Sequence, residues 1–298
     1  MGYGDYSAES RSNRSFSEGY TDRTKSVHQV FKQREMYPLM NPKGVKFREA
    51  VDSEDHPNTI PIIFGLDETG SMGSIPRAFI ADGLPTVMST LIQGGLKDAT
   101  MLFIGIGDHE YDYAPLQVGQ FESSDELLDK WLSNIWIEGK GGGNAGESYF
   151  LAHYFAAYHT KTDAWDKRKQ KGFLFTVGDE PTLKSIPSSI LSEIMGDAFQ
   201  SGKSFTAEGC IVAAQEMYHV FHFHISETTS GRARSTVEDW KELLGQNLIE
   251  VDDYHKIPQL MIQIILSNTK NPAERTAPKT PKTSPEAPSI PSSEDEVL

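Results

Sequence analysis

Two kinds of segment alternate along most of the chain. Continuous apolar runs of strand length are separated by longer stretches whose apolar residues recur with helical spacing. The strand-like runs cover residues 60–66, 100–107, 172–178, 219–225 and 247–251. The helical stretches cover residues 74–93, 124–136, 147–159, 184–195, 206–218, 236–244 and 256–268.

This alternation indicates the fold class. Continuously apolar strands are typical of a parallel sheet that is covered on both faces, and the regular exchange of strand and helix is typical of an α/β domain. We therefore predict an α/β fold with a doubly wound, mostly parallel sheet. The short run at 115–121 follows the second strand directly, and we predict one added antiparallel edge strand there.

The ends of the chain differ from this middle. Residues 1–27 are rich in Ser, Tyr, Gly, Arg and Asp and almost free of aliphatic side chains, and residues 271–298 are rich in Pro, Ser, Thr and acids. Both compositions predict disorder. We expect residues 28–57 to form an arm packed on the domain, and residues 58–270 to form the domain itself.

Charge and cysteine content narrow the function classes. The formal net charge of −14 disfavours nucleic-acid binding, because phosphate backbones are repelled. Cys210 is the only cysteine, which excludes an intrachain disulfide and a cysteine-based zinc site. No apolar run has the length of a membrane span, and the first residues lack the apolar core of a signal peptide. We expect a cytoplasmic protein.

The strongest candidate for a functional site follows the first predicted strand. That strand stops at Asp67-Glu68-Thr69-Gly70-Ser71, so Asp67, Thr69 and Ser71 place three oxygen donors at alternate positions. They lie at the carboxyl end of a predicted parallel strand, where open α/β sheets bind their ligands. Hard oxygen donors without sulfur or imidazole suit Mg²⁺.

Three more polar loops are predicted at the same edge of the sheet. They are Gly107-Asp108-His109-Glu110, the glycine-rich Lys140–Ser148 loop and Gly178-Asp179-Glu180-Pro181. Glycines allow the backbone to approach an ion closely, and the acids supply negative charge. Each loop alone is an ordinary turn or helix cap. Their joint placement along an alternating chain favours a metal site.

These motifs together resemble the von Willebrand factor type A (vWA) domain and its metal-ion-dependent adhesion site, the MIDAS. The family's Asp-x-Ser/Thr-x-Ser motif corresponds to Asp67-x-Thr69-x-Ser71, and the DxTGSM form is typical of intracellular members. The family's glycine-rich loop corresponds to Gly142-Gly143-Asn144-Ala145-Gly146-Glu147-Ser148, a GGGxxxE-type sequence. Its third contribution, an acid after the fourth strand, corresponds to Asp179.

The resemblance implies a Rossmann-like vWA fold and a Mg²⁺ site, with Mn²⁺ and Ca²⁺ as alternative ions. The implied ligands are Asp67, Thr69, Ser71, Asn144 and Asp179. Asn144 departs from the family, which places Thr or Asp there, so this ligand is neutral. Three more acids are candidates to contact the ligands rather than the metal itself: Glu68, Asp108 and Glu147.

The implied function is protein binding without catalysis. A carboxylate of the partner completes the metal's coordination, and movement of the last helix, here 256–268, often accompanies that step. Intracellular members commonly act as adaptors for MoxR-type AAA+ ATPases, which makes such an ATPase the first partner to expect.

Two alternatives start from the same residues or their neighbours. The first is a hydrolase that uses the same crevice and depends either on the metal or on Ser71. Thr69-Gly70-Ser71-Met72-Gly73 between strand and helix is similar to a nucleophile elbow, with Ser71 as nucleophile and Asp179 and a later histidine as partners. Asp67 and Glu68 oppose that reading, because they place negative charge beside a developing oxyanion. His222 and His224 have the spacing of a zinc pair, but no third ligand is evident, and we expect them to be packed in the protein.

Overall fold

A central six-stranded sheet organises the molecule. The computed structural model describes residues 5–139, 144, 146–197 and 203–270. The predicted tail 271–298 lies outside them. Neighbouring strands follow the order β10-β9-β6-β2-β3-β4, and all pairs are parallel except β3 with β4. The strands are β2 (Ile60–Asp67), β3 (Ala99–Ile106), β4 (Leu116–Val118), β6 (Gly172–Gly178), β9 (Tyr218–Ile225) and β10 (Leu248–Val251).

This topology confirms the predicted fold class, a doubly wound, mostly parallel α/β sheet with one short antiparallel edge strand. Strand β2 lies between β3 and β6. In chain order β3 is the next strand of this sheet after β2, and β6 is the next strand of this sheet after β4. The direction of winding therefore reverses between β2 and β6. Ligand sites of open α/β sheets occur at such a switch point, outside the carboxyl ends of the strands.

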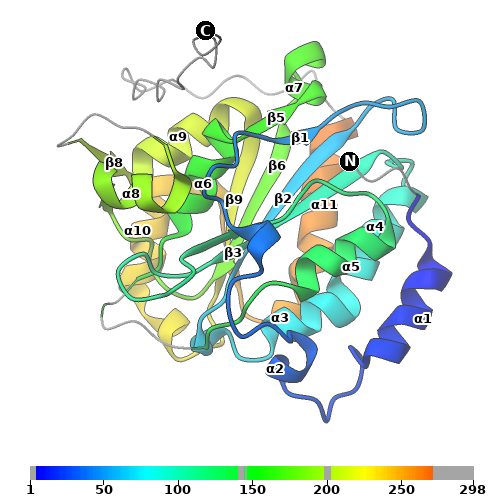
Figure 1. Cartoon of the computed structure of the whole chain (residues 1–298), viewed down its shortest axis with the longest axis horizontal. Coiled ribbons are helices and arrows are strands. Elements are labelled where there is room, and N and C mark those ends of the chain that lie inside the picture. Colours follow the sequence, from blue (N-terminus) through cyan, green and yellow to red (C-terminus); the bar gives the residue numbers. More distant parts are fainter. Residues whose placement is uncertain (1–4, 140–143, 145, 198–202, 271–298) are drawn as a thin grey trace, which may run out of the picture.

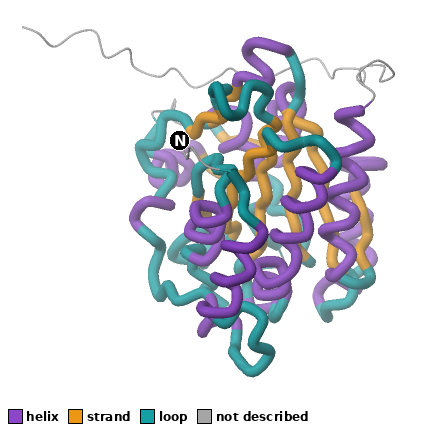
Figure 2. Tube along the Cα trace, turned by 90° about the vertical axis from the view of Figure 1, so that its right-hand side faces the viewer, coloured by secondary structure: helices purple, strands orange, loops and turns teal. Residues whose placement is uncertain are grey.

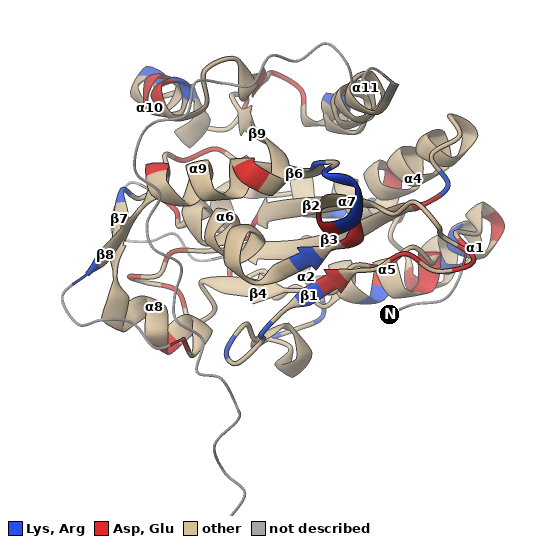
Figure 3. Ribbon diagram, turned by 90° about the horizontal axis from the view of Figure 1, so that it is seen from above, with Lys and Arg blue, Asp and Glu red and all other residues tan. Residues whose placement is uncertain are grey.

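Helices cover both faces of the sheet (Figures 1 and 3). The two layers enclose separate apolar cores, because successive side chains of each strand point to opposite faces. One layer consists of α3 (Ile75–Ala78), η3 (Phe79–Gly83), α4 (Leu84–Gln93), α5 (Asp125–Ser133) and α11 (Ile257–Lys270). The other consists of α6 (Tyr149–Tyr158), α8 (Ser188–Met195), α9 (Ala207–Met217) and α10 (Arg234–Leu244). Figure 2 shows the strands between the helices.

The predicted helix 74–93 is interrupted. Between α3 and α4 the chain forms a π-helical turn, η3. Pro85 at the start of α4 lacks the amide hydrogen that an α-helix would use at that position, and π-turns of this kind are often found at functional sites.

The N-terminal segment contains more structure than its composition predicts. Residues 8–18 form helix α1 (Ala8–Glu18), capped by Ser7 and ended by Gly19 in the left-handed conformation at φ 71°. Polar contacts hold helix α1 against the domain, so no apolar pattern in the sequence could predict it. Arg11 is 1% exposed, forms an ion pair with Asp129 at 2.8 Å and donates to the carbonyl oxygen of Ile80 in the π-turn.

Short elements outside the main sheet also lack a periodic signal in the sequence. Strands β1 (Arg48–Ala50) and β5 (Thr160–Thr162) form a parallel pair, and β7 (Ser185–Pro187) and β8 (Ser204–Thr206) form an antiparallel pair. Three residues are too few to show alternation. In the part of the chain that the structure describes, no helix is both long enough and apolar enough to cross a bilayer.

Buried histidines make the stability of the fold dependent on pH. Burial lowers the pKa of His153, on α6, to about 4, and burial also lowers the pKa of His222 well below its usual value. The unfolded chain takes up a proton on each histidine below about pH 6.5, whereas the folded chain does not. The contribution of these two histidines to the free energy of unfolding therefore decreases as the pH falls from 6.5 to 4, whereas buried acids with a raised pKa, Asp67 and Glu147, contribute with the opposite sign.

We predict that His153→Gln removes the His153 contribution, so that the free energy of unfolding of the variant rises relative to that of the wild type as the pH falls from 6.5 to 4, by about 1.4 kcal/mol for each pKa unit that separates the two states. Urea unfolding at a series of pH values measures the slope. His255→Gln is the matched control, because His255 is exposed. Equal slopes for the wild type and His153→Gln would contradict the prediction.

Candidate metal centre

The structure brings four of the predicted ligands together through two hydrogen bonds and a contact between two hydroxyl oxygens. The Thr69 hydroxyl donates to Asp67 Oδ1 at 2.6 Å, and the Ser71 hydroxyl donates to Asp179 Oδ1 at 2.8 Å. The two hydroxyl oxygens are 3.1 Å apart. Residues 67 and 179 are 112 positions apart in sequence, and they meet because β2 and β6 are neighbours whose carboxyl ends flank the switch point.

Local geometry sets the turn that presents these side chains. Asp67 is the last residue of β2, and Thr69 precedes the short helix η2 (Gly70–Met72). The Thr69 amide also donates to Asp67 Oδ1, at 2.9 Å, which closes a tight turn after the strand. Gly70 must lack a side chain, because a Cβ there would lie 2.7 Å from the Gly139 carbonyl oxygen.

The carboxylates of the site are held away from water. Asp67 and Asp179 are both 0% exposed. Burial, and after it the negative charge of Asp179, raises the pKa of Asp67 to about 7. Burial and the charges of Asp67, Asp112 and Asp108 raise the pKa of Glu147 to about 10. Two buried acids side by side destabilise each other, and a cation between them would remove that cost.

The oxygen atoms fit a small divalent cation. No group of three or more His, Cys, Asp or Glu side chains within the described ranges is arranged to hold a metal, so a site here depends on the hydroxyls. Each hydroxyl donates its hydrogen to a carboxylate, so its lone pairs remain available to a cation, and the two hydroxyl oxygens are 3.1 Å apart. Adjacent ligands of octahedral Mg²⁺ are about 3.0 Å apart when each Mg–O distance is about 2.1 Å. Asp179 Oδ2 is buried and has no hydrogen-bond partner among the described residues.

The fifth predicted ligand, Asn144, is placed differently. Its amide donates to Glu110 Oε2 at 2.8 Å, which ties the glycine-rich loop to the loop after β3. The structure gives it no hydrogen bond to Asp67, Thr69, Ser71 or Asp179. Of the same loop, residues 140–143 and 145 lie outside the described residues.

The three predicted supporting acids surround the site unequally. Glu147 and Asp108 lie near enough to interact electrostatically with each other, and Glu147 also with Asp67. Glu68 points elsewhere and accepts a hydrogen bond from Gln117 on β4. Glu68 is fully buried, and burial together with the charges of Glu138 and Asp112 raises its pKa well above the usual value.

Sequence reasoning missed two residues that organise the site. The Tyr149 hydroxyl donates to Asp67 Oδ2 at 2.5 Å. The Ser148 hydroxyl accepts from the His109 amide at 3.0 Å and contacts His109 Nδ1 at 2.7 Å. Ser148 is the last residue of the glycine-rich loop and Tyr149 follows it directly, and that position was the only available signal.

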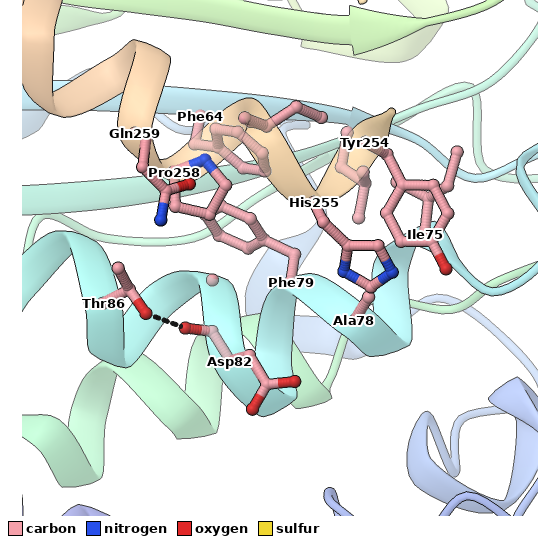
Figure 4. A pocket seen from close by; sticks show the side chains of 13 residues that line it. Phe64, Ile75, Ala78, Phe79, Asp82, Thr86, Tyr254, His255, Pro258 and Gln259 are labelled. Atoms are coloured by element: carbon pink, nitrogen blue, oxygen red, sulfur yellow. Dashed lines mark hydrogen bonds between the residues drawn. The ribbon is translucent and has the colours of Figure 1, made fainter. Parts of the chain in front are cut away.

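The helical segment after the metal motif borders a groove of about 120 Å³ against α11, which is lined by apolar and polar side chains (Figure 4). Phe64, Phe79, Tyr254 and Pro258 are among its lining residues. At its end near the metal motif, the hydroxyl oxygens of Ser74 and Tyr254 are 3.3 Å apart. The predicted last helix, 256–268, corresponds to α11, and Tyr254, which contacts Ser74, lies in the short helix η6 (Tyr254–Lys256) just before it.

Comparisons with known proteins give distant structural similarities. No protein-family model and no curated protein sequence matches this chain. A pilus adhesin, SpaC from Lactobacillus rhamnosus GG in its open conformation, is 12% identical with a TM-score of 0.47, over 76% of this chain and 31% of that chain. The vWF domain of the type V pili tip protein Mfa5 from Porphyromonas gingivalis is 8% identical with a TM-score of 0.47, over 74% of this chain and 99% of that one. Proximal thread matrix protein 1 from the mussel byssus is 8% identical with a TM-score of 0.46, over 70% and 48%.

This chain therefore spans about a third of the length of the SpaC chain that it matches. Identities of 8 and 12% say nothing about ligands or partners. Site and function depend on the residues of this chain.

The buried carboxylate pair leads to a stability prediction. Asp179→Asn removes one of two neighbouring buried charges, so in the presence of EDTA at pH 8 we expect the variant to be more stable than the wild type by about 1 kcal/mol. The same substitution should abolish any stabilisation by Mg²⁺. Thermal unfolding with EDTA and with Mg²⁺ measures both effects.

The exposed Asp55 provides the matched control, Asp55→Asn. It should change neither the stability in EDTA nor the effect of Mg²⁺. If Asp179→Asn were destabilising in EDTA, the repulsion assigned to this carboxylate pair would be wrong.

Proposed function

We propose that this chain is a Mg²⁺-dependent protein-binding module. The metal would be held by Asp67, Thr69, Ser71 and Asp179, with Asn144 as a further ligand from the glycine-rich loop. The observation that carries the proposal is the Thr69–Ser71 oxygen pair, 3.1 Å apart, with each hydroxyl hydrogen directed to a buried carboxylate. Mn²⁺ can replace Mg²⁺ in such an oxygen site.

The donor set explains why a protein carboxylate would be the ligand. Two of the four donors are neutral hydroxyls, and the amide oxygen of Asn144 is also neutral. Mg²⁺ requires six oxygen ligands and keeps several waters when the protein supplies few. A site of this kind therefore accepts one more anionic oxygen, and an Asp or Glu side chain of another protein supplies it.

The partner itself is proposed from the family resemblance. Intracellular vWA proteins with DxTGSM motifs act as adaptors for MoxR-type AAA+ ATPases, so such an ATPase is the partner to test first. Fold similarity alone does not identify a partner, and we give this step as a proposal separate from metal binding.

The contacts of Ser71 lend no support to a serine nucleophile. In the described contacts, the Ser71 hydroxyl interacts with Thr69 and Asp179, and neither is an imidazole. The later histidines are engaged elsewhere: His222 Nδ1 contacts the Thr176 hydroxyl at 2.8 Å, and His224 Nε2 contacts the Gly231 carbonyl oxygen at 2.8 Å. An activated serine needs a base within hydrogen-bond reach.

Metal titration tests the site. We expect calorimetry to show saturable binding of Mg²⁺ and Mn²⁺ to the wild type, and loss of at least tenfold in affinity in Asp67→Ala, equivalent to about 1.4 kcal/mol. Asp239→Ala is the matched control, because Asp239 is exposed on α10. Retention of full affinity by Asp67→Ala would overturn the proposed site.

A second titration addresses the carboxylate. The probe is acetate added to the Mn²⁺-loaded protein, with acetamide as the uncharged control and water-proton relaxation as the readout. Replacement of metal-bound water by acetate, but not by acetamide, is the expected result. Identical responses to the two compounds would contradict carboxylate binding.

A further inference from the structure

A buried phenol occupies one oxygen of the candidate metal ligand Asp67. Tyr149, the first residue of α6, is 0% exposed, and its hydroxyl donates to Asp67 Oδ2 at 2.5 Å. The other oxygen, Asp67 Oδ1, accepts from the Thr69 amide and hydroxyl. Oδ1 therefore faces the metal motif, whereas Oδ2 faces the phenol of Tyr149.

The phenol of Tyr149 fits against the sheet because residue 178 is a glycine. A Cβ at Gly178, the last residue of β6, would lie 1.8 Å from the Tyr149 hydroxyl oxygen. Any residue other than glycine at the end of β6 would therefore displace the phenol. Gly178 directly precedes the candidate ligand Asp179, so the same turn accommodates Tyr149 and delivers the second carboxylate.

An aromatic cluster holds the ring of Tyr149 in place. His222 on β9 and Trp240 on α10 both contact it edge to face, with ring centroids 5.1 and 5.4 Å away. His222 and Trp240 stack on each other at 3.7 Å. Trp240 Nε1 also donates to the Glu180 carbonyl oxygen at 3.0 Å, next to Asp179. The phenol is thus fixed by packing against regular elements.

We propose that Tyr149 makes the site selective for Mg²⁺ over Ca²⁺, an inference that rests on the proposed metal-binding function. Ca²⁺ binds six to eight oxygens at about 2.3–2.6 Å and commonly takes both oxygens of one carboxylate, whereas Mg²⁺ takes single oxygens in an octahedron. The hydrogen bond from Tyr149 prevents Asp67 from offering both oxygens. The 3.1 Å spacing of the two hydroxyls also matches the smaller ion.

The test is Tyr149→Phe, which removes the hydroxyl and keeps the ring. Calorimetric titration with MgCl2 and with CaCl2 gives the ratio of the two dissociation constants. We expect the preference for Mg²⁺ over Ca²⁺ to fall at least fivefold in Tyr149→Phe, because Oδ2 becomes available to Ca²⁺. Tyr154→Phe is a matched control on the same helix, since the Tyr154 hydroxyl donates to Asp197, at 3.1 Å, and makes no contact with Asp67.

A second variant tests the same role of Tyr149 independently, in case Tyr149→Phe does not fold. Gly178→Ala keeps the phenol but displaces it, and it should lower the preference for Mg²⁺ in the same direction. If the wild type binds Mg²⁺ and neither variant changes the ratio, the role of Tyr149 is wrong while the metal site stands. If Tyr154→Phe changes the ratio as much as Tyr149→Phe, the effect is not specific and the inference also fails. If the wild type binds no Mg²⁺, the inference and the proposed function fail together.

Discussion

The carboxylates of Asp67 and Asp179 both end up fully buried at the carboxyl edge of neighbouring parallel strands. Transfer of two like charges out of water costs several kcal/mol per ion unless they are compensated. The protein compensates in part with hydroxyl and phenol donors, from Thr69, Ser71 and Tyr149. The rest of the local structure follows from this constraint, because the tight turn after β2, Gly178 and the buried aromatic cluster all serve to hold those donors in place.

The same burial of two carboxylates favours metal binding and lowers the stability of the metal-free protein. The buried carboxylates repel each other and destabilise the folded protein when no metal is bound. A divalent cation that binds between them removes this repulsion. Such a site stores part of its binding free energy as electrostatic repulsion in the metal-free state. The N-terminal segment contributes in the opposite sense: Arg11 supplies a buried positive charge to Asp129, and its second contact reaches the π-turn that follows the metal motif.

The sequence was sufficient for the architecture and for the prediction that four polar residues of the candidate site lie at one edge of the sheet. Long apolar runs predicted five strands of the main sheet, and residues 115–121 predicted the antiparallel edge, because buried parallel strands are continuously apolar. The meeting of Asp67, Thr69 and Ser71 with Asp179 follows from strand order. Helix α1 could not be predicted, since it is anchored by the ion pairs of Arg11 and Arg14 rather than by apolar packing.

Tyr149 shows the other limit of sequence reading. An aromatic residue at the start of an apolar helix is indistinguishable from a core residue until the fold places it beside Asp67. Likewise, the pair His222 and His224 has the spacing of zinc ligands, but His222 stacks on Trp240 and supports the phenol. These roles depend on contacts between β2, α6, β9 and α10, which no local pattern encodes.

The central claim is that a divalent cation lies between the two hydroxyls. An anomalous difference map from crystals grown with MnCl2 tests it most directly, because it locates the ion independently of any functional assay. We predict one strong peak within about 2.3 Å of both Thr69 Oγ1 and Ser71 Oγ. A map without a peak there, or with manganese bound only at other acidic residues, would contradict the claim.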